Sequence, residues 1–352
     1  MGSSEKKRKT YIDFLKIIAI YMVLFNHTAR KGFSLFTVRQ DSVFYAFYLF
    51  NAVFIKVAVP LFLMASGALL LGRDHEIRSV VKRFFRFLTV LIAASFISYL
   101  YQCFRLHQLQ FSIKEFFVTI YQQPINLAIW YLYVYLAFIL MLPILSHMAK
   151  SMDDRTYKWM LLMYGLIMFL PIPEFLIWHG EATHYSKFYF FVSTQYAFFS
   201  LMGYYIDKKA KITRKQAIIL CAAGFIAIVV CCIMTNYRCN LLNAWETDNI
   251  DTFFGCIIYM PSIALFYAAK YWFENHQIPD RISNALSIIA SGTFGLFLIE
   301  DICREETMQV FWKLNDHIPT LIACWVWILT ACVLGIVVTL LLKKIPGVSR
   351  YI

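Results

Sequence analysis

The chain has 352 residues, of which 60% are hydrophobic and 15% are charged, and its formal net charge is +12. Soluble domains carry about 25% charged residues, so this composition excludes a soluble globular protein and predicts an integral membrane protein. Apolar runs recur from end to end without a long polar block, which predicts one membrane domain over residues 1–352.

Apolar windows separated by polar segments predict an all-α, polytopic fold with about ten transmembrane helices. Each window is about as long as a helix needs to be to cross a hydrocarbon core roughly 30 Å thick. The expected spans are residues 11–29, 50–71, 85–104, 128–149, 157–178, 188–206, 217–235, 252–272, 286–303 and 320–342.

The basic residues are distributed by membrane side. Segments on the N-terminal side of the membrane hold 22 Lys and Arg residues, and segments on the opposite side hold 9. Because Lys and Arg favour cytoplasmic loops, both termini are expected in the cytoplasm of a multi-pass protein of the cell membrane, plasma or inner. The same distribution makes the lipid bilayer, and not nucleic acid, the expected partner. No feature of the sequence indicates an oligomeric state.

The first expected span carries three ionisable side chains, Asp13, Lys16 and His27. Charged groups inside a span are costly, so their presence suggests a function. With Asp13 set at 0° around a helix axis, Lys16 falls at about 300° and His27 at about 320°, and His27 lies roughly 16 Å above Lys16. This spacing predicts a polar stripe that leads up to His27. Alternatively, Asp13 and Lys16 form no more than an ion pair at the membrane rim.

Three ionisable residues from three spans are expected in one layer near the outer face. Counted from the cytoplasmic end of each span, His27 and Lys56 lie roughly 24 Å up and Glu300 roughly 21 Å up. Asp301 is adjacent, and Trp130 enters its span at a similar level. A neutral imidazole accepts protons near neutral pH, so His27 is a candidate general base. Glu300 or Asp301 can then hold its tautomer, and Lys56 can stabilise a developing oxyanion.

These side chains also have structural interpretations. His27 can be a satisfied polar residue near the interface, and Lys56 can extend its ammonium to the membrane surface. Glu300 and Asp301 can mark an interfacial helix end.

Other polar residues are expected near the outer face. The residues assigned to the substrate and oxyanion side of the site are Lys56, Asn26 and Trp130. His179, Glu181 and His184 are further outer-face groups, but their spacing does not suggest a metal site, and no metal is expected.

On the cytoplasmic side, Arg83 and Arg86 stand three residues apart in a basic segment. On a helix they project from one face, where guanidinium groups can bind phosphates in a bidentate manner. The alternative is that both arginines only anchor the helix on the positive side of the membrane.

Five segments of the chain form a set: YIDFLKIIAIYMVLFNHT, VAVPLFLMASGALL, Arg83-Phe-Phe-Arg86, Trp130-Tyr-Leu…Leu142-Pro143 and Thr293-Phe-Gly-Leu-Phe-Leu-Ile-Glu300. Together they resemble the membrane-bound acyltransferase-3 family, and the resemblance covers nearly the whole chain. The first resembles the Asp-x-x-Arg…His helix of that family, and the second resembles its Val-Pro-Leu-Phe-Phe…Ser-Gly segment. The others resemble its RxxR, Trp-x-Leu…Leu-Pro and Ser-Phe-Gly-x-Tyr-Leu-x-His segments.

The resemblance implies roles for individual residues. His27 would be the essential catalytic histidine, and Arg83 with Arg86 would bind an acyl-CoA donor from the cytoplasm. Lys16 stands where the family usually has Arg, which keeps the charge but loses the fork geometry. Together with Asp13 it is assigned to the donor side. Glu300 stands where many members have His, so that residue's role does not transfer.

The expected function is transfer of an acyl group, here acetyl from the co-substrate acetyl-CoA, to a hydroxyl of an extracytoplasmic carbohydrate or glycolipid. Two alternatives stay open. One is a transporter or flippase for a glycan or small solute, since intramembrane charges and proline-broken helices also serve transport. The other is a membrane sensing module that has kept the fold without the chemistry. The sequence does not reveal the acceptor, the position acylated, or a preference for acetyl over succinyl.

Overall fold

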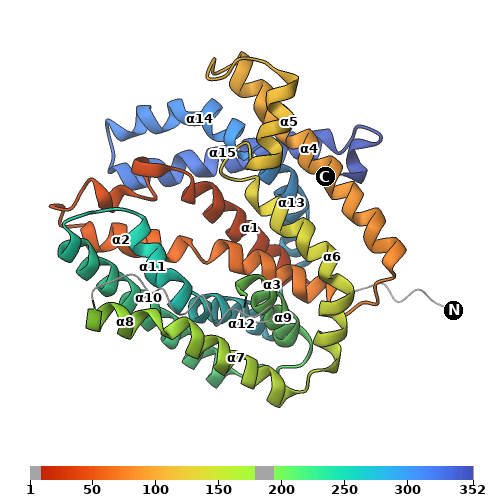
Figure 1. Ribbon diagram of the computed structural model, residues 1–352, viewed down its shortest axis with the longest axis vertical. Helices are drawn as coiled ribbons and strands as arrows, with labels where there is room; N and C mark the ends of the chain where they lie inside the picture. The colour runs from red at the N-terminus through yellow and green to blue at the C-terminus, as the bar shows by residue number, and fades with distance from the viewer. Residues whose placement is uncertain (1–8, 179–193, 352) are drawn as a thin grey trace.

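The structure is a computed structural model that describes residues 9–178 and 194–351. The expected all-α fold is confirmed, because every regular element in these ranges is a helix (Figure 1). The α-helices are α1 (Thr10–Asn26), α2 (Tyr45–Ile55), α3 (Ala58–Leu70), α4 (Ile77–Phe104), α5 (Ile113–Gln122), α6 (Trp130–Ser151), α7 (Asp154–Phe169), α8 (Pro171–Trp178), α9 (Gln195–Lys208), α10 (Arg214–Leu242), α11 (Asp248–Ile257), α12 (Tyr259–Asn275), α13 (Asp280–Leu298), α14 (Glu300–Asn315) and α15 (Thr320–Leu342), with short 3₁₀ turns at Ala29–Lys31, Leu35–Thr37 and Val348–Arg350.

Within the described residues, six helical segments are long and apolar enough to cross a membrane: α2 with α3, α4, α6, α10, α13 and α15. This confirms a polytopic membrane protein. The helices in the four other expected spans are shorter, with 17 residues in α1, 16 in α7, 14 in α9 and 17 in α12. The count of ten spans and the cytoplasmic position of the termini therefore stay predictions.

The expected span 286–303 is not a single helix, which corrects the sequence-based boundary. α13 ends at Leu298, and Ile299 adopts a non-helical backbone with φ −124° and ψ 20°. α14 then begins at Glu300 and runs beside α15 (Figure 1). The break places Glu300 and Asp301 in the first turn of a helix, where its dipole favours negative charge.

α1 runs through the middle of the bundle, packed against α3, α12, α13 and α15 (Figure 1). α3 in turn packs closely on α9, through two glycines. A Cβ atom on Gly67 would lie 1.8 Å from the carbonyl oxygen of Ser200, and one on Gly203 would lie 2.0 Å from that of Met64. Only glycine permits this approach of two backbones, which is a common device between membrane helices. The contact holds α3 in place on one side of α1.

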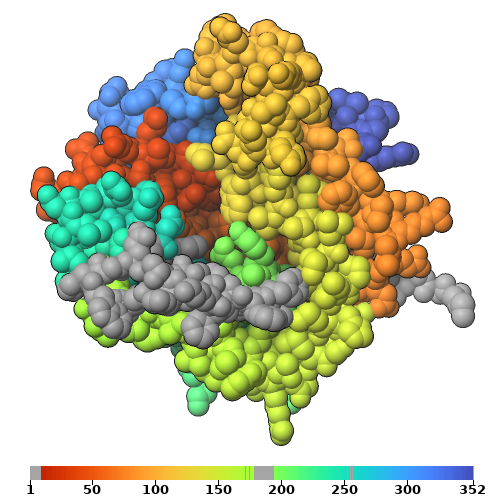
Figure 2. All heavy atoms as spheres, in the orientation of Figure 1, coloured from red at the N-terminus to blue at the C-terminus, as the bar shows by residue number. Residues whose placement is uncertain are grey.

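The segment between α4 and α6 projects beyond the rest of the molecule (Figure 2). α5 lies in this segment and buries Phe116 and Ile120 against Tyr99 and Cys103 of α4. Its outer face leaves Tyr121 exposed over 91% of its surface. A helix with one buried and one exposed apolar face is suited to lie at the interface between membrane and water.

Candidate functional site

His27 lies where α1 ends. Its backbone N–H donates to the Leu24 carbonyl at 3.2 Å, closing the last turn of the helix. Thr28 holds the chain that follows, since its hydroxyl donates to the Phe25 carbonyl at 2.7 Å and accepts from the Phe33 N–H at 2.9 Å. The His27 side chain is only 8% exposed, so the ring is fixed inside the protein.

The His27 ring contacts the carboxylate of Glu300 in the first turn of α14. Nδ1 of His27 and Oε1 of Glu300 are 2.9 Å apart, and the Glu300 side chain is 1% exposed. Burial opposes ionisation of Glu300, but His27 and Arg304 outweigh it and hold the pKa of this carboxyl below its usual range. An ionised carboxylate only accepts hydrogen bonds, so Nδ1 is the donor and Nε2 keeps its lone pair when the ring is neutral.

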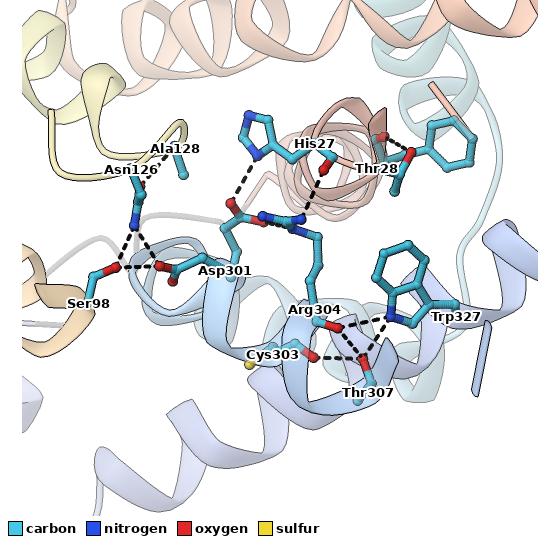
Figure 3. A network of polar contacts seen from close by, with 12 residues as sticks. His27, Thr28, Ser98, Asn126, Ala128, Asp301, Cys303, Arg304, Thr307 and Trp327 are labelled. Carbon is cyan, nitrogen blue, oxygen red and sulfur yellow. Dashed lines mark hydrogen bonds and ion pairs between the residues drawn. The ribbon is translucent and has the colours of Figure 1, made fainter. Parts of the chain in front are cut away.

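Arg304 binds both partners of this contact. Its role was not predicted from the sequence, where it was only one of the basic residues assigned to the outer side of the membrane. Its Nε donates to Glu300 Oε2 at 2.8 Å, and its Nη1 donates to the backbone carbonyl of His27 at 2.9 Å (Figure 3). The Arg304 side chain is 12% exposed. The signal that could have found it is the spacing of Glu300 and Arg304, four residues apart on one helix face.

Asp301 faces away from His27, so the structure separates two carboxylates that are adjacent in the sequence. Its carboxylate accepts from the Ser98 hydroxyl of α4 and, at 2.8 Å, from the Asn126 amide (Figure 3). Oδ1 of Asn126 accepts from the N–H groups of Ala128 and Ile129, both at 3.0 Å, just before α6 begins. Asp301 therefore ties α14 to α4 and α6, and burial raises its pKa.

A cavity of about 520 Å³ lies along α1, between α3, α6 and α13. The polar stripe predicted on the first span faces it. Asp13 and Lys16 line the cavity lower on α1, and Asn26 and His27 line it at the helix end. The cavity thus connects the level of Lys16 with the catalytic candidate His27 through the interior of the protein.

Lys56 and Trp130 also line the cavity, together with His27. The Lys56 ammonium forms an ion pair with Asp251 of α11 and lies 5.5 Å from the centre of the Phe33 ring. Its charge is therefore already balanced by a carboxylate. In Asn26, by contrast, Oδ1 is buried and has no hydrogen-bond partner among the described residues.

Arg83 and Arg86 lie beside the cavity but are not among its lining residues. Phe87 and Tyr135 are part of that lining. The Arg86 guanidinium lies 5.5 Å from the centre of the Phe87 ring, and both arginines act electrostatically on the Tyr135 hydroxyl. Nη1 of Arg83 is buried without a hydrogen-bond partner in the described part of the chain. The arginine pair therefore adjoins the cavity wall, and Arg83 retains hydrogen-bonding capacity.

No group of three or more His, Cys, Asp or Glu residues arranged to hold a metal occurs in residues 9–178 and 194–351. His179, Glu181 and His184 lie outside the described residues.

The fold and the site define a polytopic membrane protein with a buried histidine and carboxylate pair beside an interior cavity. A family model described as an acyltransferase domain matches residues 9–344. The chain belongs to this acyltransferase-3 family, as the five sequence segments suggested, and is a membrane acyltransferase. No curated protein and no solved structure matches the chain.

Proposed function

We propose that the protein transfers an acetyl group from cytoplasmic acetyl-CoA to a hydroxyl of an extracytoplasmic carbohydrate or glycolipid, with His27 as general base. The observation that carries this proposal is the 2.9 Å contact between His27 Nδ1 and Glu300 Oε1 at the end of the cavity. A carboxylate that fixes the tautomer of a buried imidazole is the arrangement that prepares a histidine to take a proton.

In the proposed reaction, Nε2 of His27 takes the proton of the acceptor hydroxyl as its oxygen attacks the thioester carbonyl. The tetrahedral intermediate collapses, the carbon–sulfur bond breaks, and the departing thiolate takes the proton from His27 to give free CoA. Glu300 stabilises the imidazolium that exists between the two steps. General base catalysis of this kind contributes typically about 10² to 10⁴ in rate.

The position of the cavity supports a donor that enters from the cytoplasmic side. Arg83 and Arg86 adjoin the cavity wall, where they would bind the phosphates of the donor. Its narrow pantetheine arm would follow the cavity past Lys16 towards His27. Only the acetyl group then has to cross to the outer side of the membrane.

The residues around His27 support an acceptor that carries hydroxyl groups. Oδ1 of Asn26 offers a buried acceptor without a partner among the described residues, directly before His27. Trp130 lines the same cavity, where its ring would offer an apolar face to a sugar. Lys56 would stabilise the oxyanion, which requires its ammonium to reach past its ion pair with Asp251.

The proposal places the protein in the cell membrane, plasma or inner, as one domain that binds acyl-CoA and a glycan or glycolipid. Its first test separates an acyltransferase from a transporter. Acetyl-CoA at 100 times its dissociation constant should stabilise the purified protein by about 2.7 kcal/mol in a thermal unfolding assay. Cells with the chain should also carry more alkali-labile acetate on their surface carbohydrate than cells without it. Absence of both effects would refute the proposal, and donor binding without surface acetate would indicate a silent sensing module.

A further inference from the structure

The Arg304 guanidinium joins the two partners of the catalytic contact. It donates one hydrogen bond to Oε2 of the Glu300 carboxylate and another to the backbone carbonyl of His27. A lysine could not do this in the same way, because the two bonds use the planar fork of a guanidinium. Arg304 thus holds the end of α1 and the start of α14 in one fixed relation.

The same group decides the charge balance around Glu300. This carboxylate is 1% exposed, and a buried anion requires a cation nearby. Without Arg304, the nearest cation available to Glu300 would be the imidazolium form of His27 itself, which cannot act as a base. With Arg304 at 2.8 Å, the carboxylate already has its counter-ion when the ring is neutral.

We propose that Arg304 is a positioning residue that serves as the counter-ion of Glu300 and thereby keeps Nε2 of His27 unprotonated and aimed for catalysis. This inference rests on the proposed function of His27. It assigns to Arg304 a role that a bond between His27 and Glu300 alone would not supply.

The other ionisable groups around the pair do not replace Arg304. Asp301 carries the same sign as Glu300 and is bound by Ser98 and Asn126. The thiols of Cys303 and Cys332 lie within electrostatic reach of Glu300, but a thiol is neutral or negative and supplies no cation. Lys56, across the cavity, forms its ion pair with Asp251.

Arg304 is itself held in place by α15. The indole Nε1 of Trp327 donates to the Arg304 carbonyl and to the Thr307 hydroxyl, both at 3.1 Å (Figure 3). The Thr307 hydroxyl donates to the Cys303 carbonyl at 2.6 Å. These bonds fix the turn of α14 that carries the guanidinium, so its position is set before any substrate arrives.

The test compares the full-length wild-type protein with Arg304→Gln and Arg304→Lys. Imidazole ¹⁵N resonances report directly which ring nitrogen of His27 carries a proton, and the His27 signals are those missing from a His27→Gln variant. At pH 7.5 we expect an unprotonated Nε2 in the wild type and in Arg304→Lys. In Arg304→Gln we expect Nε2 to be protonated. This readout needs no turnover, so it decides the role of Arg304 even if the proposed transfer reaction is wrong.

Turnover of acetyl-CoA supplies the second readout. The low-pH limb of the rate profile should move up by at least about one pH unit in Arg304→Gln, with a rate loss of roughly tenfold at pH 7 that recovers at pH 9. The KM for acetyl-CoA should stay within about twofold, since Arg304 lies away from the donor end of the cavity.

Arg105→Gln is the matched control, because Arg105 pairs with Glu306 of the same helix α14 at an exposed position. It should leave the His27 resonances and the rate profile unchanged. If Arg304→Gln keeps Nε2 unprotonated, the proposal is overturned. If Arg304→Gln does not fold, a protonated Nε2 in Arg304→Lys overturns it equally.

Discussion

His27 Nδ1 and Glu300 Oε1 lie 2.9 Å apart although their residues are 273 positions apart in the sequence. The contact forms where α1 ends and α14 begins, so two helix termini meet at the cavity. Because Glu300 takes up the Nδ1 side of the ring, the Nε2 side is left for chemistry. The predictions below concern this contact, the cavity that leads to it and the helix packing that supports it.

Replacing Glu300 with glutamine should impair transfer much more than folding. An amide of the same shape keeps a hydrogen bond to His27 but cannot stabilise the imidazolium by charge. We expect kcat for acetyl-CoA turnover to fall by roughly 10² or more, with the KM for acetyl-CoA nearly unchanged. Steady-state kinetics of the purified variant measure both values, and an undiminished kcat would contradict the role of Glu300.

The adjacent carboxylate should behave differently. Burial raises the pKa of Asp301, so keeping it ionised costs folding free energy once the pH rises above the ordinary value of about 3.9. Asp301→Asn removes that cost, and the new amide oxygen can still accept from Ser98 and Asn126. We expect the variant to unfold at the same or a higher temperature at pH 7 and to lose far less activity than Glu300→Gln. Asp301→Ala should lower the melting temperature, because it leaves Ser98 and Asn126 without this acceptor.

The arginine pair should affect donor binding and leave the chemical step unchanged. Each hydrogen bond to a charged group contributes about 1.5 to 3 kcal/mol, so Arg83→Gln or Arg86→Gln should raise the KM for acetyl-CoA by about tenfold or more. Arg78→Gln, on an exposed position of the same helix α4, is the control and should change KM by less than about twofold. If all three variants shift KM alike, then Arg83 and Arg86 contribute only general positive charge.

Packing of α3 on α9 should tolerate no side chain at Gly203. A Cβ atom there would lie 2.0 Å from the Met64 carbonyl oxygen, and a backbone atom cannot move aside as a flexible side chain can. Gly203→Ala should therefore reduce the amount of folded, monodisperse protein recovered in detergent, measured by size-exclusion chromatography. Gly255→Ala is the control, because its nearest neighbour would be 3.9 Å away in the Met168 side chain. Equal recovery of both variants would contradict the close contact.

Helical periodicity correctly predicted that Asp13, Lys16 and His27 share one side of α1, because side chains repeat about every 3.6 residues. Lys56 and Trp130, which were expected at the level of His27, line the same cavity as His27. The periodicity prediction succeeded because it depends only on position within one helix.

Contacts that depend on the chain leaving a helix could not be predicted in this way. Successive residues on a helix point about 100° apart, so the choice between Glu300 and Asp301 as the partner of His27 depends on where α14 begins. That start is set by the break at Ile299, which no proline or glycine marks. The Arg304 contact with the His27 carbonyl follows from the same break, and the Lys56 ion pair with Asp251 joins distant segments.

The central claim is that His27 catalyses, as general base, the transfer of acetyl groups that are supplied from the cytoplasmic side through the interior of the protein. Sealed membrane vesicles of uniform orientation, given acetyl-labelled acetyl-CoA on the cytoplasmic face, test it most directly. The account predicts labelled carbohydrate on the opposite face with the wild type and with His147→Ala, an exposed histidine of α6, and none with His27→Ala although it still binds acetyl-CoA. Label transferred at the wild-type rate by His27→Ala would contradict it.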